Sequence, residues 1–75
     1  MLNNEEIEIL KTIGEKVKFF RELRNFSQHE LSIEAEIPKN QVGRIERAEI
    51  NTTVLTIHKI AKALDVNVKV LFENK

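Results

Sequence analysis

The side chains that most often carry catalytic or metal chemistry are few in this chain and lie far apart. His29 and His58 fall on separate segments, and neither has a second ligand three or four residues away. A zinc site needs three or four converging ligands. Glu34 and Glu36 are neighbours on a predicted turn, where we expect exposure and not a buried acid/base pair. The sequence also lacks a glycine-rich phosphate loop, a nucleophile elbow and a Ser/His/Asp set. We therefore predict that the chain is not an enzyme, holds no metal or cofactor and needs no small-molecule ligand.

Residues 27–47 predict two short helices joined by a tight turn. Ser27 and Glu30 have the spacing of a capping box, in which the two side chains bond the free amides of the first turn. That helix has to stop before Pro38, which suits the first position of the following helix. Val42 and Ile45 give the second helix one apolar stripe. Its outer faces then hold Lys39, Asn40, Gly43, Arg44 and Arg47.

The remaining segments predict three more helices that hold this pair in place. The first runs over residues 4–25, capped by Asn3 or Asn4, with Phe19 and Leu23 covering the flank of its core stripe. That stripe consists of Ile9, Ile13, Val17 and Phe20. Thr53 caps a helix that carries an apolar face over residues 54–64, and Asn67 caps a last short helix over residues 68–72. The expected architecture is all-α, with five helices around one core.

Composition sets the remaining limits. Seventy-five residues make one domain, and the absence of cysteine fits a reducing cytosol and excludes a disulfide framework. No apolar run approaches a membrane span. Twelve acidic and twelve basic residues are a poor signature for a nucleic-acid binder, but they are unevenly placed. Residues 1–10 carry three glutamates and no base, whereas residues 11–26 carry five bases against two acids.

The sequence resembles the Cro and phage-repressor (Xre-like) family of bacterial transcription regulators, whose domain is a five-helix, lambda-repressor-like fold with a helix-turn-helix. The match runs without gaps over residues 13–72, and residues 1–12 extend the first helix. Its most specific pieces are Phe26–Leu31, Val42–Arg47 and Ile60–Val66. This chain departs from the family pattern at positions where the family usually has Gly, Ala, Gly and Pro. Respectively, these positions are Glu36, Ser32, Ala48 and Thr52, so the glycine positions are Glu36 and Ala48.

The resemblance implies a role for each polar residue of this region. Lys39, Asn40 and Arg44 match the family's base-facing positions, and such side chains pair with guanine or adenine edges in the major groove. Gln28 matches a phosphate contact made at the start of the preceding helix, and Gln41 and Arg47 are expected to contact the DNA backbone. Arg21 and Glu46 match a pair that joins the first helix to the end of the recognition helix, so we expect a structural role for both.

Taken together, these features predict a cytoplasmic, sequence-specific regulator of double-stranded DNA, acting as a homodimer on a two-fold operator. The alternative is an antitoxin-like or accessory protein-interaction module that keeps the fold without specific DNA binding, as the neutral net charge suggests. The operator sequence, the sign of regulation and the choice among phage repressor, restriction–modification controller and antitoxin stay open. For the dimer contact we expect residues 68–72, which hold more apolar residues than a short terminal helix buries, over the competing Ile7 and Leu10.

Overall fold

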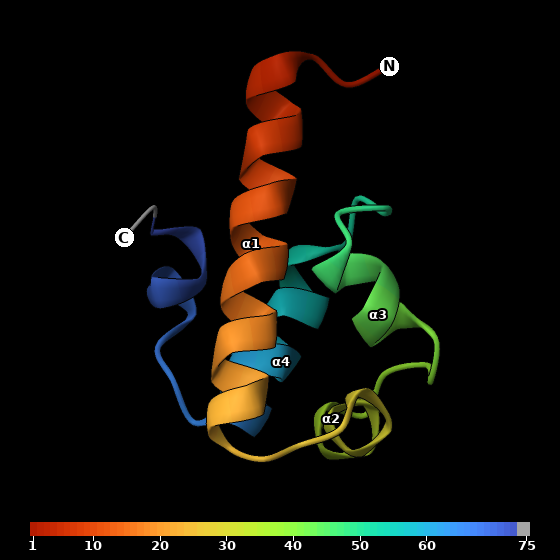
Figure 1. Ribbon diagram of the computed structural model, residues 1–75, viewed down its shortest axis with the longest axis vertical. Helices are drawn as coiled ribbons and strands as arrows, with labels where there is room; N and C mark the ends of the chain where they lie inside the picture. The colour runs from red at the N-terminus through yellow and green to blue at the C-terminus, as the bar shows by residue number, and fades with distance from the viewer. Residues whose placement is uncertain (74–75) are drawn as a thin grey trace.

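A computed structural model describes residues 1–73 as four α-helices and one short 3₁₀ helix. In chain order they are α1 (Asn4–Leu23), α2 (Gln28–Ala35), α3 (Gln41–Glu46), α4 (Val54–Leu64) and the 3₁₀ helix η1 (Val68–Phe72). The long α1 packs against α3 and η1, and α2 packs against α4 and α3 (Figure 1). The all-α prediction is confirmed, with the last of the five predicted helices formed as a 3₁₀ helix.

Local side-chain bonds begin the helices where the sequence predicts them. Capping boxes form at Asn3 with Glu6 and at Ser27 with Glu30, each with both reciprocal bonds present. The hydroxyl of Thr53 accepts the amide of Thr56 at 3.1 Å, which caps α4. These bonds satisfy amides that have no partner inside their own helix, so the starts of α1, α2 and α4 are each encoded within three residues.

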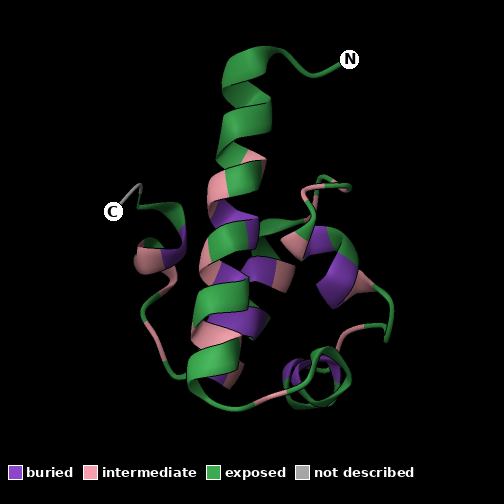
Figure 2. Ribbon diagram, in the orientation of Figure 1, coloured by how far each residue is buried: buried purple, intermediate pink, exposed green. Residues whose placement is uncertain are grey.

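The core is a single apolar cluster to which every helix contributes. Figure 2 shows its buried positions turned toward the middle of the domain. Fully buried are Val17 from α1, Leu31 from α2, Val42 from α3, Ile60 and Leu64 from α4 and Leu71 from η1. At about 25 cal/mol for each Å² of apolar surface buried, these contacts dominate the stability of the fold.

Two expectations for α1 are wrong. Ile9 is predicted on the core stripe but is 49% exposed, because the first turns of α1 extend beyond the packed core (Figures 1 and 2). Phe19 and Leu23 were expected to cover the flank of the core, yet they are 58% and 66% exposed. The ring of Phe19 meets only the edge of the neighbouring Phe20 ring, with centroids 5.0 Å apart. The helical period of the apolar residues does not show how far along α1 the other helices extend.

The turn before α3 also differs from the expectation. Pro38 does not open this helix; α3 begins at Gln41, whose amide donates to the Pro38 carbonyl at 3.0 Å. This bond spans three residues and closes a turn, so Lys39 and Asn40 stand before the helix. Asn40 occupies the capping position without a side-chain cap bond. The direction in which these two residues point is therefore set by the turn and not by helical spacing.

Left-handed backbone occurs at four residues of the described chain, and none of them is glycine. They are Asn25, Glu36, Ala48 and Asp65, with φ of 58–59°. The left-handed geometry at Glu36, where the family usually has glycine, closes α2 as a C-cap. A side chain in this conformation costs roughly 1–2 kcal/mol relative to glycine.

Candidate nucleic-acid interface

The position of α3 is set by a buried ion pair with α1. The Arg21 Nε lies 2.6 Å from Oε2 of Glu46, and Nη2 donates to Oε1 at 3.1 Å. The two side chains are only 11% and 4% exposed. The hydrogen bond to Glu46 raises the pKa of Arg21 above its ordinary value, against the opposing effect of burial. The third guanidinium nitrogen donates to the Phe26 carbonyl at 2.8 Å, so the pair also fixes the loop that leads into α2.

Gly14 is a second determinant of the α1–α3 contact, and the sequence analysis missed it. A Cβ at this position would lie 2.5 Å from the carbonyl oxygen of Ile45 and 2.7 Å from that of Glu46. Both are backbone atoms, which cannot move aside without shifting α3. The available signal was a glycine inside a strongly periodic helix, which usually has a packing reason.

The side chain of Gln28 is part of the same junction. Its amide nitrogen donates to Oε1 of Glu46 at 3.0 Å, which ties the first residue of α2 to the end of α3. A Cβ at Gly43 would lie 3.0 Å from both Gln28 Oε1 and Arg47 Nη1. Gly43 therefore lets these two side chains lie close against α3. Any contact of the Gln28 side-chain amide with a phosphate has to exchange this existing bond.

The predicted base-facing residues are all exposed to solvent. Lys39 and Asn40 are exposed in the turn, and Arg44 is exposed on α3. Gln41 is half-buried at the start of α3, and its backbone amide is already bonded to Pro38. Because the apolar residues of α3 face the core, the polar ones are the part of this helix that a ligand can reach.

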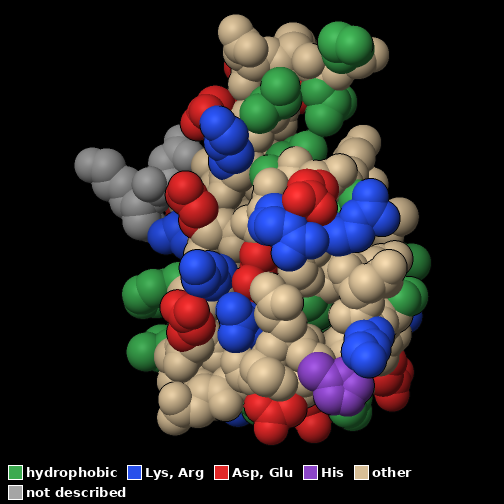
Figure 3. Space-filling view, turned by 45° about the vertical axis from the view of Figure 1, so that its right-hand side comes forward, with side chains coloured by type: hydrophobic (Ala, Val, Ile, Leu, Met, Phe, Trp, Pro, Cys, Tyr) green, Lys and Arg blue, Asp and Glu red, His purple; other side chains and the backbone are tan. Residues whose placement is uncertain are grey.

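Glu49 is a further charged residue of this surface that the sequence analysis did not single out. Its carboxylate accepts from Nε and Nη2 of Arg47 at 2.8 and 3.3 Å, and Nε of Arg44 lies 4.0 Å from Oε1. The hydrogen bond with Arg47 holds the pKa of Glu49 below its usual range and raises the pKa of Arg47. Acidic and basic side chains are interleaved on the face that carries α3 (Figure 3). Arg47, at the end of α3, thus already binds a carboxylate, and Arg44 lies at the edge of ion-pair distance from the same group.

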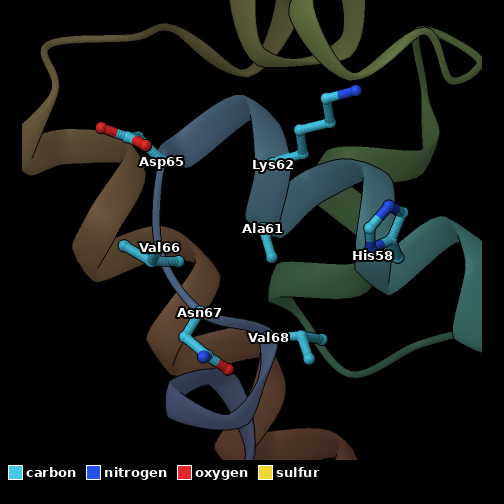
Figure 4. Close-up of a pocket in the computed structure, with 7 residues that line it drawn as sticks. All are labelled: His58, Ala61, Lys62, Asp65, Val66, Asn67 and Val68. Carbon is cyan, nitrogen blue, oxygen red and sulfur yellow. The ribbon is translucent and has the colours of Figure 1, made fainter.

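A surface hollow lies between α4 and η1. It is lined by His58, Ala61, Lys62, Asp65, Val66, Asn67 and Val68. Figure 4 shows the side chains of Lys62 and Asp65 pointing in different directions, so their charges do not converge on one point. In residues 1–73, no group of three or more His, Cys, Asp or Glu side chains is placed to hold a metal ion. Among the same residues, no helix has the length and apolar character to cross a bilayer.

A family model described as helix-turn-helix (HTH_3) matches residues 17–71. The chain belongs to this family. Among curated proteins, it is 32% identical to the control protein C.SmaI of Serratia marcescens over 62 residues, which cover 83% of this chain and 74% of that protein. It is 31% identical to the HTH-type transcriptional regulator SinR of Bacillus subtilis over 64 residues, covering 84% of this chain but only 58% of SinR. The family resemblance stated from the sequence is thereby confirmed.

Solved structures of similar proteins share the fold described above. The restriction–modification controller protein C.AhdI of Aeromonas hydrophila matches with a TM-score of 0.81 and 30% identity, over 84% of this chain and 96% of that chain. A hypothetical transcription factor, NHTF, from Neisseria matches with a TM-score of 0.85 and 26% identity, over 87% and 75%. The helix-turn-helix family is one of regulators, so the match supports a regulatory and not a catalytic role.

Proposed function

We propose that the chain binds a specific double-stranded DNA sequence by placing α3 and the turn before it in the major groove. As a member of the helix-turn-helix family, it is a DNA-binding transcription regulator. The observation that carries the specific role is the exposed set Lys39, Asn40 and Arg44 on an element that α1 holds rigidly through Arg21 and Glu46. A fixed helix with polar outer residues suits direct reading of base edges. The relatives named above are bacterial proteins, so we expect this protein to act on DNA in the cytoplasm.

In this proposal the base contacts follow from the chemistry of each side chain. Arg44 pairs with the O6 and N7 acceptors of a guanine, Asn40 with adenine and Lys39 with guanine acceptors. Lys39 and Asn40 are exposed in the turn before α3 and Arg44 is exposed on α3, which supports an order of Lys39, Asn40 and Arg44 along the groove. Together they read a short stretch of adjacent base pairs.

The backbone contacts come from Gln28, Gln41 and Arg47. Gln28 starts α2, whose first amides point toward the incoming phosphate together with its side chain. Arg47 uses Nε and Nη2 for Glu49, which leaves Nη1 outside that pair for a phosphate oxygen. Such contacts set the register of the protein on the duplex and carry no sequence information directly.

We further propose a homodimer on a two-fold operator, because one recognition helix neutralises few phosphates. The reason first given for the C-terminal contact is wrong: Leu71 is fully buried and Val68 and Val70 are half-buried in their own subunit. Phe72 stays 49% exposed. It lines one surface hollow with Ile9 of α1, and we propose this hollow as the dimer face in place of the competing Ile7 and Leu10.

Sedimentation at micromolar concentration tests the dimer. Phe72→Glu and Ile9→Glu change residues of equal exposure on this face, and both should dissociate the dimer. Leu55→Glu changes a residue that is 71% exposed on α4 and serves as the control, which should sediment like the parent. A monomeric parent, or dissociation by the control alone, removes this proposal.

Selection of bound fragments from random duplex DNA tests sequence-specific binding, followed by two variants on the selected duplex. Arg44→Ala should cost about 1–3 kcal/mol at one base pair and flatten the preference there. Gln28→Ala should weaken selected and scrambled duplexes by the same factor. If Arg44→Ala also weakens both duplexes equally, Arg44 does not read a base.

The alternative function is a protein-interaction module of antitoxin-like or accessory type. It is favoured by the formal net charge of zero and by the carboxylate that already occupies Arg44 and Arg47. Against it, the exposed side of α3 and its turn is charged and polar, whereas the centres of protein interfaces are depleted in charge. A selection that enriches no duplex sequence, with binding only at low salt, decides in favour of this alternative.

A further inference from the structure

The place of Glu49 is set by the backbone at the end of α3. Ala48 is left-handed with φ of 58°, and the Glu49 amide turns back to donate to the Arg44 carbonyl at 2.8 Å. The Ala48 amide donates to the Ile45 carbonyl at 3.0 Å, and the two bonds together form a Schellman motif. The Glu49 side chain therefore starts from a defined point beside the outer face of α3. Its contact with the two arginines is built into the helix end.

The Glu49 carboxylate binds Arg47 more closely than Arg44. Arg47 is held by two hydrogen bonds at 2.8 and 3.3 Å, whereas Arg44 lies at the edge of ion-pair distance, 4.0 Å away. All three side chains are about half exposed, between 47% and 57%. Exposed ion pairs contribute little to stability, because water and salt screen them and the side chains lose freedom. An incoming anion can therefore replace Glu49 without damaging the fold.

We propose that Glu49 is an affinity-determining residue that competes with DNA for Arg44 and Arg47. The inference rests on the proposed function, since it assigns a role within the same DNA surface. For either arginine to bind a phosphate or a base, it has to leave or share the carboxylate. Replacing the Glu49 carboxylate by a DNA phosphate as the partner of an arginine therefore gains little binding free energy. The Glu49 carboxylate is also left near the phosphates with fewer cations beside it, and the like charges repel.

The competition affects every duplex in the same way. Each arginine gives up part of its attraction to Glu49 whether it meets a guanine or a phosphate, so the loss is common to matched and unmatched DNA. Glu49 therefore lowers absolute affinity and leaves the ratio of specific to non-specific affinity in place. It also removes one net positive charge from the interface, which reduces the number of phosphates effectively neutralised and flattens the salt dependence.

Glu49→Gln tests the inference by removing the charge and keeping the shape. The probes are a duplex selected by the parent protein and a scrambled duplex of equal length and composition, titrated at several salt concentrations. The variant should bind both duplexes about three- to tenfold more tightly. Its plot of log affinity against log salt should steepen by about 0.9, the slope for one further phosphate.

Two controls separate local competition from the change in total charge. Glu15→Gln makes the same charge change at an exposed residue of α1, for which the described residues provide no ion-pair partner. It should leave the salt slope as in the parent. In an Arg44→Ala/Arg47→Ala background, Glu49→Gln should change affinity no more than Glu15→Gln does, because the groups competed for are gone.

Three results would overturn the proposed role of Glu49. Equal effects of Glu49→Gln and Glu15→Gln overturn it, and so does an undiminished effect in the double-alanine background. Weaker binding by Glu49→Gln also overturns it, because Glu49 would then position Arg47 for DNA. A parent protein that selects no sequence refutes the proposed function itself, a result seen before any variant is made.

Discussion

Two arginine–glutamate pairs have their glutamates three residues apart at the end of α3, and the pairs contrast in burial. Glu46 is bound by Arg21 from α1 and is 4% exposed, and Gln28 also donates to it. Glu49 is bound by Arg47 from its own helix end and is 47% exposed. The hydrogen-bond distances are similar, at 2.6 and 2.8 Å for the shorter contacts. Geometry alone therefore does not distinguish the two pairs.

Burial and connectivity give the two pairs different physical consequences. Removing one partner of the buried pair leaves a charge without water, and the loss is felt by α1, α2 and α3 together. Removing one partner of the exposed pair leaves a charge that water accepts readily. The first pair is therefore part of the scaffold that orients the recognition helix, and the second is available for exchange with a ligand.

The largest expected effect comes from breaking the buried pair. Glu46→Ala should lower the free energy of unfolding by about 3–5 kcal/mol, because Arg21 keeps its charge in a mostly buried position. Thermal unfolding without DNA measures this as a fall of about 12 °C or more. Arg21→Ala should destabilise similarly. If Arg21→Ala kept the melting temperature but lost DNA affinity, Arg21 would be a phosphate contact and the scaffold assignment would be wrong.

A second effect comes from the close approach that accompanies this pair. Gly14→Ala should cost about 1–3 kcal/mol, since the added Cβ meets the backbone of Ile45 and Glu46. Gly43→Ala is the matched control, because its Cβ meets only the movable ends of the Gln28 and Arg47 side chains. Alanine also improves helix propensity by up to about 1 kcal/mol, so this control should not destabilise. Equal losses in urea unfolding from both variants would contradict the special role of Gly14.

Ala48, the left-handed residue between Glu46 and Glu49, should give a smaller change in stability, of the opposite sign. Ala48→Gly should stabilise the protein by about 1 kcal/mol, because glycine adopts the φ of 58° without steric cost. Asn25→Gly makes the comparison at a similar angle with a residue that tolerates this conformation better, and it should gain less. Urea unfolding of both variants measures the difference. No gain at Ala48 would mean that the entropy of glycine in the unfolded state outweighs the relieved strain.

The smallest effect on stability should follow from breaking the exposed pair. Glu49→Gln should leave the melting temperature without measurable change, since both partners are open to solvent. The same variant should alter DNA affinity, which separates the two pairs in a single experiment. A clear fall in melting temperature would show that Glu49, like Glu46, stabilises the fold, and it would contradict the contrast between the two pairs.

Much of the fold could be predicted from the residues because its signals are local. The capping boxes at Asn3 and Ser27 act within three residues, and Thr53 and Asn67 mark the last two helix starts in the same way. The apolar period likewise identified Ile13 and Val17 as core positions. Such features depend on chain geometry that is the same wherever the segment lies, so a single sequence displays them.

The tertiary structure alone decided which side chains of the proposed interface are bound by other side chains of the protein. The packing of α1 on α3 gives Gly14 its role, and the closing turn at Ala48 brings Glu49 to Arg44 and Arg47. The meeting of α1 with η1 places Ile9 beside Phe72, far apart in the chain. In each case the contact depends on how two helices pack or on one backbone angle. Neither the periodicity nor the composition of the sequence specifies such a contact.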